Sequence, residues 1–95
     1  MNNYYIYILL CSDNSYYIGV TNNIQNRIIQ HESGSDSLSY TFNKRPIKLV
    51  YTETFNDIKQ AIEREKQLKK WSRAKKEALI NNETDKLNEL SKNNK

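Results

Sequence analysis

The sequence predicts a small α/β (α+β) domain, in which a three-stranded, mainly antiparallel sheet is flanked by about three helices. Three observations predict this class. Two short runs rich in tyrosine and isoleucine, 4–10 and 16–20, are separated by polar residues, which is typical of a β-hairpin. A third run of strand-forming residues covers 47–55, and helical patterns begin near positions 24, 58 and 73. The 95 residues suffice for one domain with a modest core.

The polar turn determines which side chains of the hairpin share a face. A three-residue loop, with Asn14 in the left-handed conformation that asparagine tolerates, places Tyr7 opposite Gly19 and Leu9 opposite Tyr17. A two-residue loop would instead place Tyr7 and Tyr17 on opposite faces. Because side chains alternate along a strand, the three-residue loop predicts one common face made of Tyr5, Tyr7, Leu9, Tyr17 and Gly19. We expect the glycine to leave open space beside the two phenols.

The first helix is expected to begin near Ile24, after a Thr-Asn-Asn capping sequence. Ile24, Ile28 and His31 fall on one stripe, and Arg27 borders it. Since this stripe must cover the sheet, we expect Arg27 and His31 to point towards the tyrosine face. The alternative is that the two side chains are exposed to solvent or ion-paired, with Glu32 as the nearest carboxylate.

A serine-rich connector, residues 33–45, follows this helix and shows neither helical nor strand periodicity. Gly34 is expected to end the helix. Connectors of this length are uncommon in small domains unless they are functional or mobile. Tyr40, Lys44 and Arg45 are candidates for phosphate contacts, and the two basic residues are equally compatible with plain surface charge.

The second half of the chain is expected to form one strand and two helices. Along 47–55 the apolar residues Ile47, Leu49, Tyr51 and Phe55 fall on one parity, which predicts that this side packs under the helices. Asp57 is the expected N-cap of the next helix. Ser72 is the expected cap of the last helix, over 73–81, and Trp71 is expected to anchor the junction between the two by packing.

Glu65 is the unusual charge in the first of these two helices. Its neighbours at helical spacing are the apolar residues Ile58, Ala61, Ile62 and Leu68. A carboxylate on a core-facing stripe is costly unless it is paired or coordinates a cation. The residues leave two interpretations open: a metal ligand, or a structural partner of Arg27, Lys69 or a tyrosine hydroxyl.

The charge distribution is uneven. Residues 1–43 carry a net charge of −2 and residues 44–95 one of +6, and seven basic side chains lie between positions 64 and 76. Such a concentration is typical of a protein that binds a polyanion, and a solvated helix face would show it too. The candidate nucleic-acid contacts are the basic residues Lys44, Arg45, Lys69, Lys70, Arg73, Lys75 and Lys76.

Composition argues against several other classes. No apolar run approaches the ~20 residues that a membrane span needs, and the first residues do not resemble a signal peptide. The single cysteine, Cys11, cannot form an internal disulfide, which fits a reducing cytoplasm, and we expect it to be a small packed side chain. Residues 1–82 are expected to form one domain, followed by a partly disordered tail over 83–95.

The order of these residues resembles the GIY-YIG nuclease superfamily. Its first motif corresponds to Tyr5-Ile6-Tyr7 and its second to Tyr17-Ile18-Gly19, and the family's arginine, histidine and glutamate correspond to Arg27, His31 and Glu65. The first glycine of the family motif is replaced here by Tyr5. The small stand-alone bacterial branch is the most similar, and the resemblance covers roughly residues 4–80.

This resemblance implies a metal-dependent endonuclease that hydrolyses phosphodiester bonds in DNA, acting in repair or recombination and selecting DNA by its structure. It implies one divalent cation, Mg²⁺ or Mn²⁺, at Glu65, and a catalytic set of Tyr7, Tyr17, Arg27 and His31. Arg27 would clamp the phosphate, and either Tyr17 or His31 would activate the attacking water. A cytoplasmic monomer without a membrane partner is expected, and RNA stays open as a substrate.

A second class of function stays open on the residues alone. A non-catalytic nucleic-acid-binding module would use the basic face over 64–76 without cutting the nucleic acid. A protein-interaction adaptor would need an exposed apolar patch, and this polar sequence predicts none. The tyrosines, Arg27 and Glu65 favour the enzyme.

Overall fold

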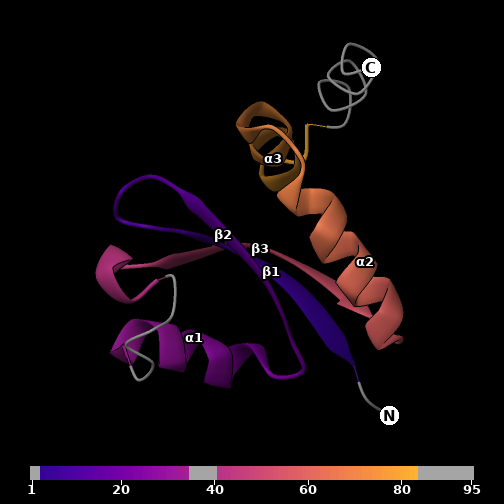
Figure 1. Cartoon of the computed structure of the whole chain (residues 1–95), viewed down its shortest axis with the longest axis horizontal. Coiled ribbons are helices and arrows are strands. Elements are labelled where there is room, and N and C mark those ends of the chain that lie inside the picture. Colours follow the sequence, from indigo (N-terminus) through magenta and orange to yellow (C-terminus); the bar gives the residue numbers. More distant parts are fainter. Residues whose placement is uncertain (1–2, 35–40, 84–95) are drawn as a thin grey trace.

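The computed structural model describes residues 3–34 and 41–83. Its elements, in chain order, are β1 (Tyr4–Leu10), β2 (Tyr16–Thr21), α1 (Ile24–Ser33), a short 3-10 turn (Phe42–Lys44), β3 (Lys48–Phe55), α2 (Ile58–Lys69) and α3 (Arg73–Ile80). The strands form one sheet in the order β2-β1-β3, and β1 runs antiparallel to both neighbours (Figure 1). The predicted α+β class is confirmed. The candidate Tyr40 and the expected tail beyond Glu83 lie outside the described residues.

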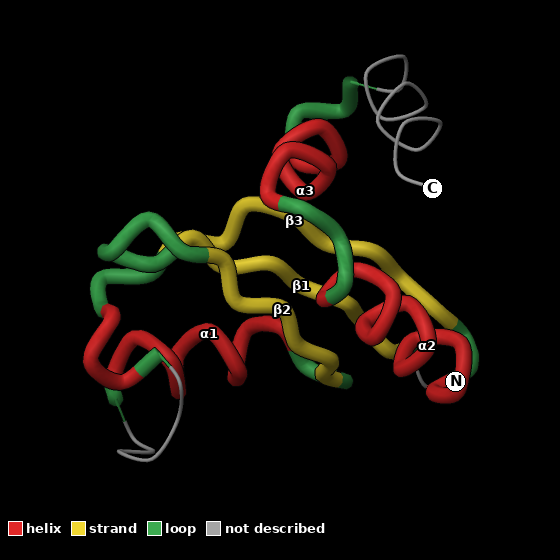
Figure 2. The backbone as a smooth tube through the Cα atoms, turned by 45° about the horizontal axis from the view of Figure 1, so that its top comes forward, coloured by secondary structure: helices red, strands yellow, loops and turns green. Residues whose placement is uncertain are grey.

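Helices cover both faces of the sheet, so the domain has two small cores. Figure 2 shows α1 on one side of the sheet and α3 on the other. On the α2–α3 side the buried residues are Ile6, Ile8, Ile18 and Leu68. On the α1 side they are Tyr7, Leu9, Cys11 and Ile47, with Tyr17, Ile24 and Ile28 packed against them. Because β1 is the central strand, its alternating side chains supply both cores.

The hairpin has the predicted geometry. Asn14 adopts a left-handed conformation with a φ of 72°. The strand pairing places Tyr7 opposite Gly19 and Leu9 opposite Tyr17. The three-residue loop and the common face of the two tyrosines are therefore confirmed.

The single apolar parity expected along β3 is wrong. Val50 is an extra residue between two consecutive pairs that β3 makes with β1. An inserted residue of this kind moves the side chains beyond it to the opposite face of the sheet. Tyr51 and Phe55 accordingly pack in the α2–α3 core, whereas Ile47 joins the α1 core and Leu49 is exposed.

Each helix begins at a residue expected to cap it. The side-chain oxygens of Asn23, Asp57 and Ser72 accept hydrogen bonds from backbone N–H groups in the first turns of α1, α2 and α3. Gly34 ends α1 in the left-handed conformation, with a φ of 66°. Within the part of the chain that the structure describes, no helix combines the length and apolar character that a membrane crossing requires.

Candidate active site

Three aromatic side chains meet on the α1 side of the sheet. Tyr7 comes from β1, Tyr17 from β2 and His31 from the last turns of α1. The ring centroids lie 5.3 Å apart for Tyr17 and His31, 5.9 Å for Tyr7 and His31, and 6.1 Å for the two tyrosines. We call these three residues the ring cluster. His31 thus faces the tyrosines, as the stripe on α1 predicts.

His31 is held at both ring nitrogens. Its Nε2 lies 3.1 Å from the Tyr7 hydroxyl, and its Nδ1 lies 2.6 Å from the Thr41 Oγ1. His31 is 7% exposed and Thr41 is completely buried. Sequence reasoning assigns Thr41 no role in the site, because this contact depends on how the connector returns to α1. The connector has no periodic pattern from which that path could be predicted.

Gly19 allows the Tyr7 ring to lie against β2. A Cβ atom at this position would lie 2.5 Å from the Tyr7 Cζ and would overlap the hydroxyl group. The open space expected beside the glycine does not exist, because the Tyr7 phenol fills it. Close approach of the ring to the strand is therefore the reason that this position needs a glycine.

Burial and neighbouring charges set the protonation of the cluster. Burial, and then the adjacent Tyr17, raise the pKa of the Tyr7 phenol well above its ordinary value. Arg27 lowers this pKa and Glu65 raises it, so a side chain of α1 and one of α2 both act on the same phenol. The pKa of His31 is lowered, first by burial and then by Arg27. At neutral pH, Tyr7 therefore keeps its proton and His31 is uncharged.

Glu65 is ion-paired within its own helix. Its side chain is 20% exposed, and its Oε2 lies 3.2 Å from the Nζ of Lys69. Of the structural partners that the sequence left open, Lys69 is thus the one observed. Residues 3–34 and 41–83 contain no group of three or more histidine, cysteine, aspartate or glutamate side chains that could hold a metal ion. A single carboxylate nevertheless suits Mg²⁺, which keeps several waters and usually takes one or two carboxylates plus substrate phosphates.

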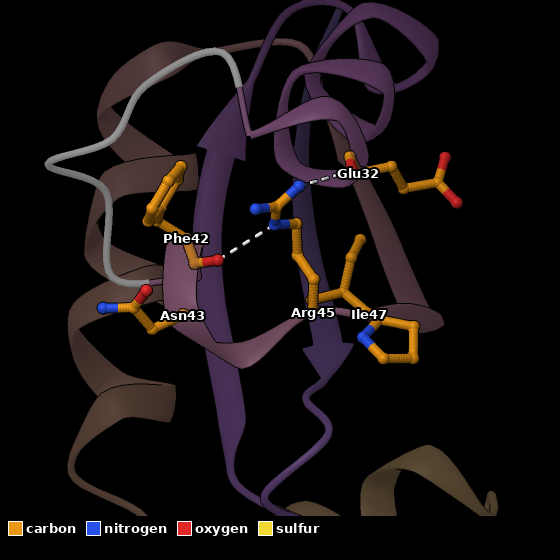
Figure 3. Close-up of a pocket in the computed structure, with 6 residues that line it drawn as sticks. Glu32, Phe42, Asn43, Arg45 and Ile47 are labelled. Atoms are coloured by element: carbon orange, nitrogen blue, oxygen red, sulfur yellow. Dashed lines mark hydrogen bonds between the residues drawn. The ribbon is translucent and has the colours of Figure 1, made fainter.

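Two of the candidate nucleic-acid contacts lie at the connector and are engaged within the protein. The Lys44 Nζ lies 2.6 Å from the Asp13 carboxylate. Arg45 donates from Nε to the Phe42 carbonyl (2.9 Å) and from Nη1 to the Glu32 carbonyl (3.4 Å), whereas the Glu32 carboxylate points away (Figure 3). The arginine thus links the 3-10 turn to the end of α1. A groove of about 620 Å³ is lined by Glu32, Phe42, Asn43, Arg45, Pro46 and Ile47.

Two basic side chains lie against the Trp71 ring, where α2 meets α3. Lys75 is 8% exposed, and its Nζ lies 4.4 Å from the centroid of the Trp71 ring. The Arg64 guanidinium lies 5.2 Å from the same ring. These contacts agree with the expected packing role of Trp71. Arg73, on α3, forms an ion pair with Glu77 at 3.2 Å.

Lys70 and Lys76 differ from the other candidate contacts. Among the seven candidates, these two have neither an ion pair nor a contact with an aromatic ring within residues 3–34 and 41–83. Lys70 is exposed and Lys76 is half-buried. Lys70 also lines a shallow groove of about 500 Å³ beside Trp71. These two side chains are therefore the candidates most available to an external phosphate.

Comparison with known proteins identifies the family of this chain. The sequence model of the GIY-YIG catalytic domain matches residues 3–78. The chain belongs to the GIY-YIG family, which is a family of nucleases.

Within this family, the chain is similar to small single-domain proteins named UPF0213. The UPF0213 protein of Natronomonas pharaonis is 41% identical over 81 residues, which are 85% of this chain and 94% of that protein. The protein YazA of Bacillus subtilis is 38% identical over 79 residues, which are 83% of this chain and 79% of YazA.

Two solution NMR structures show the same architecture. The UPF0213 protein of Bacillus halodurans is 40% identical, with a TM-score of 0.55 over 83% of each chain. A protein of E. faecalis is 32% identical, with a TM-score of 0.61 over 86% of each chain.

Proposed function

We propose that the protein is a metal-dependent endonuclease that hydrolyses phosphodiester bonds in DNA. The observation that carries this proposal is the surroundings of the Tyr7 phenol: His31 contacts its hydroxyl group and the Tyr17 ring lies beside it. Arg27 of α1 and Glu65 of α2 lie close enough to act on its pKa. Two phenols, a neutral imidazole, a guanidinium and a carboxylate can supply proton transfer, charge stabilisation and a cation ligand. Membership of a nuclease family supports the same conclusion.

Glu65 would hold one divalent cation, Mg²⁺ or Mn²⁺, which when bound would polarise the scissile phosphate and stabilise its negative charge. The Lys69 side chain must then release the carboxylate. Because that lysine side chain is 54% exposed, its ion pair contributes little and is easily exchanged.

Arg27 is assigned to the phosphate. It is exposed on α1, yet it lies close enough to lower the pKa of both Tyr7 and His31. A guanidinium binds two phosphate oxygens at once and stays charged at every relevant pH. In this position Arg27 would clamp the substrate and stabilise the additional negative charge of the transition state.

Tyr17 is our choice for the activation of the attacking water. It is half-buried, whereas Tyr7 is 1% exposed and holds its proton at neutral pH. A tyrosine side chain acts as a base only in its phenolate form, which nearby positive charge stabilises. Arg27 provides such a charge beside the ring cluster. Tyr7 would support Tyr17, and His31 would receive the displaced proton.

The DNA is proposed to cross the free edge of the sheet at β2. This strand is at the outside of the sheet, and it carries Gly19, against which the Tyr7 phenol lies. Lys70 and Lys76 would contact backbone phosphates. A preference for branched DNA, as in repair or recombination, is the finer part of this proposal. We also propose that the protein acts as a cytoplasmic monomer, and the buried unpaired Cys11 fits a reducing compartment.

A non-catalytic nucleic-acid-binding module is the second candidate function. The ion pair between Glu65 and Lys69 favours it, because a paired carboxylate is less available to a metal ion. This candidate predicts DNA binding without cleavage under every metal condition.

The experiment that separates the two candidates is cleavage of end-labelled single-stranded, duplex, flap and four-way-junction DNA. Reactions contain Mg²⁺, Mn²⁺ or chelator, and the proteins are wild type, Glu65→Gln and the control Glu63→Gln, which alters an exposed side chain of the same helix. We expect metal-dependent cutting that falls by ~100-fold or more in Glu65→Gln only. Equal cutting by wild type and Glu65→Gln would contradict the metal assignment. Binding without cutting by the wild type would favour the second candidate.

A further inference from the structure

Thr41 lies at the Nδ1 atom of His31, and Tyr7 lies at the other ring nitrogen. The distance of 2.6 Å between Nδ1 and the Thr41 Oγ1 marks a close hydrogen bond. Thr41 is completely buried, so water does not compete for this contact. The imidazole ring therefore cannot rotate without losing both of its hydrogen bonds.

A neutral imidazole has one N–H group and one free lone pair, so two arrangements are possible. In the first, Nδ1–H donates to the Thr41 Oγ1, and Nε2 accepts a hydrogen bond from the Tyr7 hydroxyl. In the second, the Thr41 hydroxyl donates to Nδ1, and Nε2–H donates to the Tyr7 oxygen. Only the first arrangement directs the basic nitrogen of His31 towards the phenols.

The first arrangement also needs less rearrangement when the ring takes up a proton. An imidazolium donates from both nitrogens, so the Thr41 oxygen must then accept. In the first arrangement it already does so. In the second, the Thr41 hydroxyl would have to rotate inside a fully buried site before His31 could become charged.

We propose that Thr41 is a positioning residue that holds His31 as the Nδ1–H tautomer, so that Nε2 is the proton acceptor of the two phenols. The catalytic effect of this tautomer rests on the proposed nuclease function, whereas the assignment of the tautomer to His31 is independent of that function. The proton of Tyr7 moves to Nε2, and the Tyr17 hydroxyl gives its proton to the Tyr7 oxygen. The resulting Tyr17 phenolate takes a proton from the attacking water as the new P–O bond forms. The P–O bond to the leaving sugar oxygen breaks in the same step, and this oxygen takes a proton from solvent water. Tyr17 and His31 then act as the two ends of one proton relay.

Nuclear magnetic resonance measures the tautomer directly, because His31 is the only histidine in the chain. The long-range ¹⁵N–¹H correlations of the imidazole are recorded above the pH at which the ring titrates. The variants are Thr41→Val, which keeps the shape of the side chain but removes the hydroxyl, and Thr41→Ser, which keeps the hydroxyl. Backbone spectra establish that each variant is folded.

We expect the Nδ1–H tautomer in the wild type and in Thr41→Ser, and a shift towards Nε2–H in Thr41→Val. An Nε2–H tautomer in the wild type would overturn the proposal, even if Thr41→Val fails to fold. A folded Thr41→Val that keeps the pure Nδ1–H tautomer would overturn it as well.

The catalytic consequence is measured by single-turnover cleavage of a DNA that the wild type cuts. We expect Thr41→Val to lower the rate constant ~10-fold or more with unchanged DNA affinity, and Thr41→Ser to restore most of it. An unchanged rate constant in a folded Thr41→Val would refute the relay. If the wild type cuts no DNA, the nuclease proposal fails, while the tautomer measurement still decides the role of Thr41.

Discussion

Tyr7 and Tyr17 share one face of the hairpin but differ in environment. Tyr7 is 1% exposed, lies against Gly19 and contacts His31, and its pKa is raised by burial. Tyr17 is half-buried and lies at the edge strand. At the scale of single residues, this difference in burial is the reason that we propose proton donation by Tyr7 and contact with the attacking water by Tyr17.

Replacement of Gly19 by alanine tests whether the position of the Tyr7 ring requires a residue without a side chain at this point of β2. The added methyl group would overlap the phenol and force the ring away from His31. We expect a loss of about 1–3 kcal/mol in the free energy of unfolding, typical of overpacking, and a fall in the cleavage rate. Val20→Ala is the matched control, because Val20 lies next in the strand and packs in the α2–α3 core. Equal cleavage by Gly19→Ala and Val20→Ala would contradict this assignment.

The lowered pKa of His31 predicts how stability depends on pH. Burial and Arg27 make proton binding weaker in the folded than in the unfolded chain, whose histidine titrates near 6.5. The unfolded state therefore binds more protons below this pH, and the free energy of unfolding should decrease as the pH falls from about 6.5. Urea denaturation at pH 7.5 and at pH 5.5 measures this decrease.

His31→Gln is the control for the pH experiment. It removes the titrating group, so we expect its free energy of unfolding to change less than that of the wild type between the two pH values. Glu53, whose pKa is lowered, takes up its proton only at more acidic pH, so it does not change the free energy of unfolding between pH 5.5 and 7.5. The same decrease in both proteins would show that His31 is not responsible.

At the scale of elements, local patterns were predictable and contacts between distant segments were not. The hairpin loop follows from Asn14, and the helix boundaries follow from Asn23 and Gly34, because each depends on a few neighbouring residues. The inserted Val50 in β3 was not predictable, since the pairing with β1 determines it and no local residue marks it.

In the candidate site, too, some contacts were predictable from the sequence and others were not. The approach of His31 to the tyrosines was predictable from the spacing on α1 and the register of the hairpin. The contact with Thr41 was not, because it closes a long connector. The engagement of Arg45 with the Phe42 and Glu32 carbonyls was equally invisible, since a basic residue in a loop has no pattern that separates a structural from a binding role.

A salt bridge between β3 and α2 leads to a prediction about stability. The Glu53 carboxylate accepts hydrogen bonds from Arg64 Nε (3.0 Å) and Nη2 (2.9 Å), and from the Tyr51 hydroxyl (2.5 Å). Because this pair is largely buried, with side chains 22% and 23% exposed, we expect Glu53→Ala to lower the free energy of unfolding by about 1–3 kcal/mol. Chemical denaturation measures it. Glu63→Ala, an exposed change on α2, should cost less than about 0.5 kcal/mol, and equal losses would contradict the prediction.

At the scale of the whole molecule, the basic residues and the ring cluster lie on different elements. The rings belong to β1, β2 and α1, whereas Lys70 follows α2 and Lys76 belongs to α3. We propose that a nucleic acid that touches both passes the edge strand β2. Affinity and cleavage should therefore respond to different mutations.

Replacement of Lys70 and Lys76 together by glutamine tests the binding part of this division. Each lysine that neutralises a phosphate releases counterions, so the slope of log K against log salt should become shallower by ~1 per contact. We expect weaker DNA binding and a shallower slope by ~2, measured by fluorescence titration at several salt concentrations. Lys59→Gln, on the first turn of α2, is the control and should leave the slope unchanged. An unchanged slope in the double variant would remove both lysines from the interface.

The most direct test of the central claim is single-turnover cleavage by Tyr17→Phe, with DNA affinity measured on the same samples. Tyr16→Phe is the matched control, because the two residues are adjacent in β2 and Tyr16 packs on the opposite face of the sheet. If the ring cluster is a nuclease site, Tyr17→Phe should lose ~10²-fold or more of the rate constant at unchanged affinity, while Tyr16→Phe keeps its activity. Cleavage by Tyr17→Phe at the wild-type rate would contradict the claim.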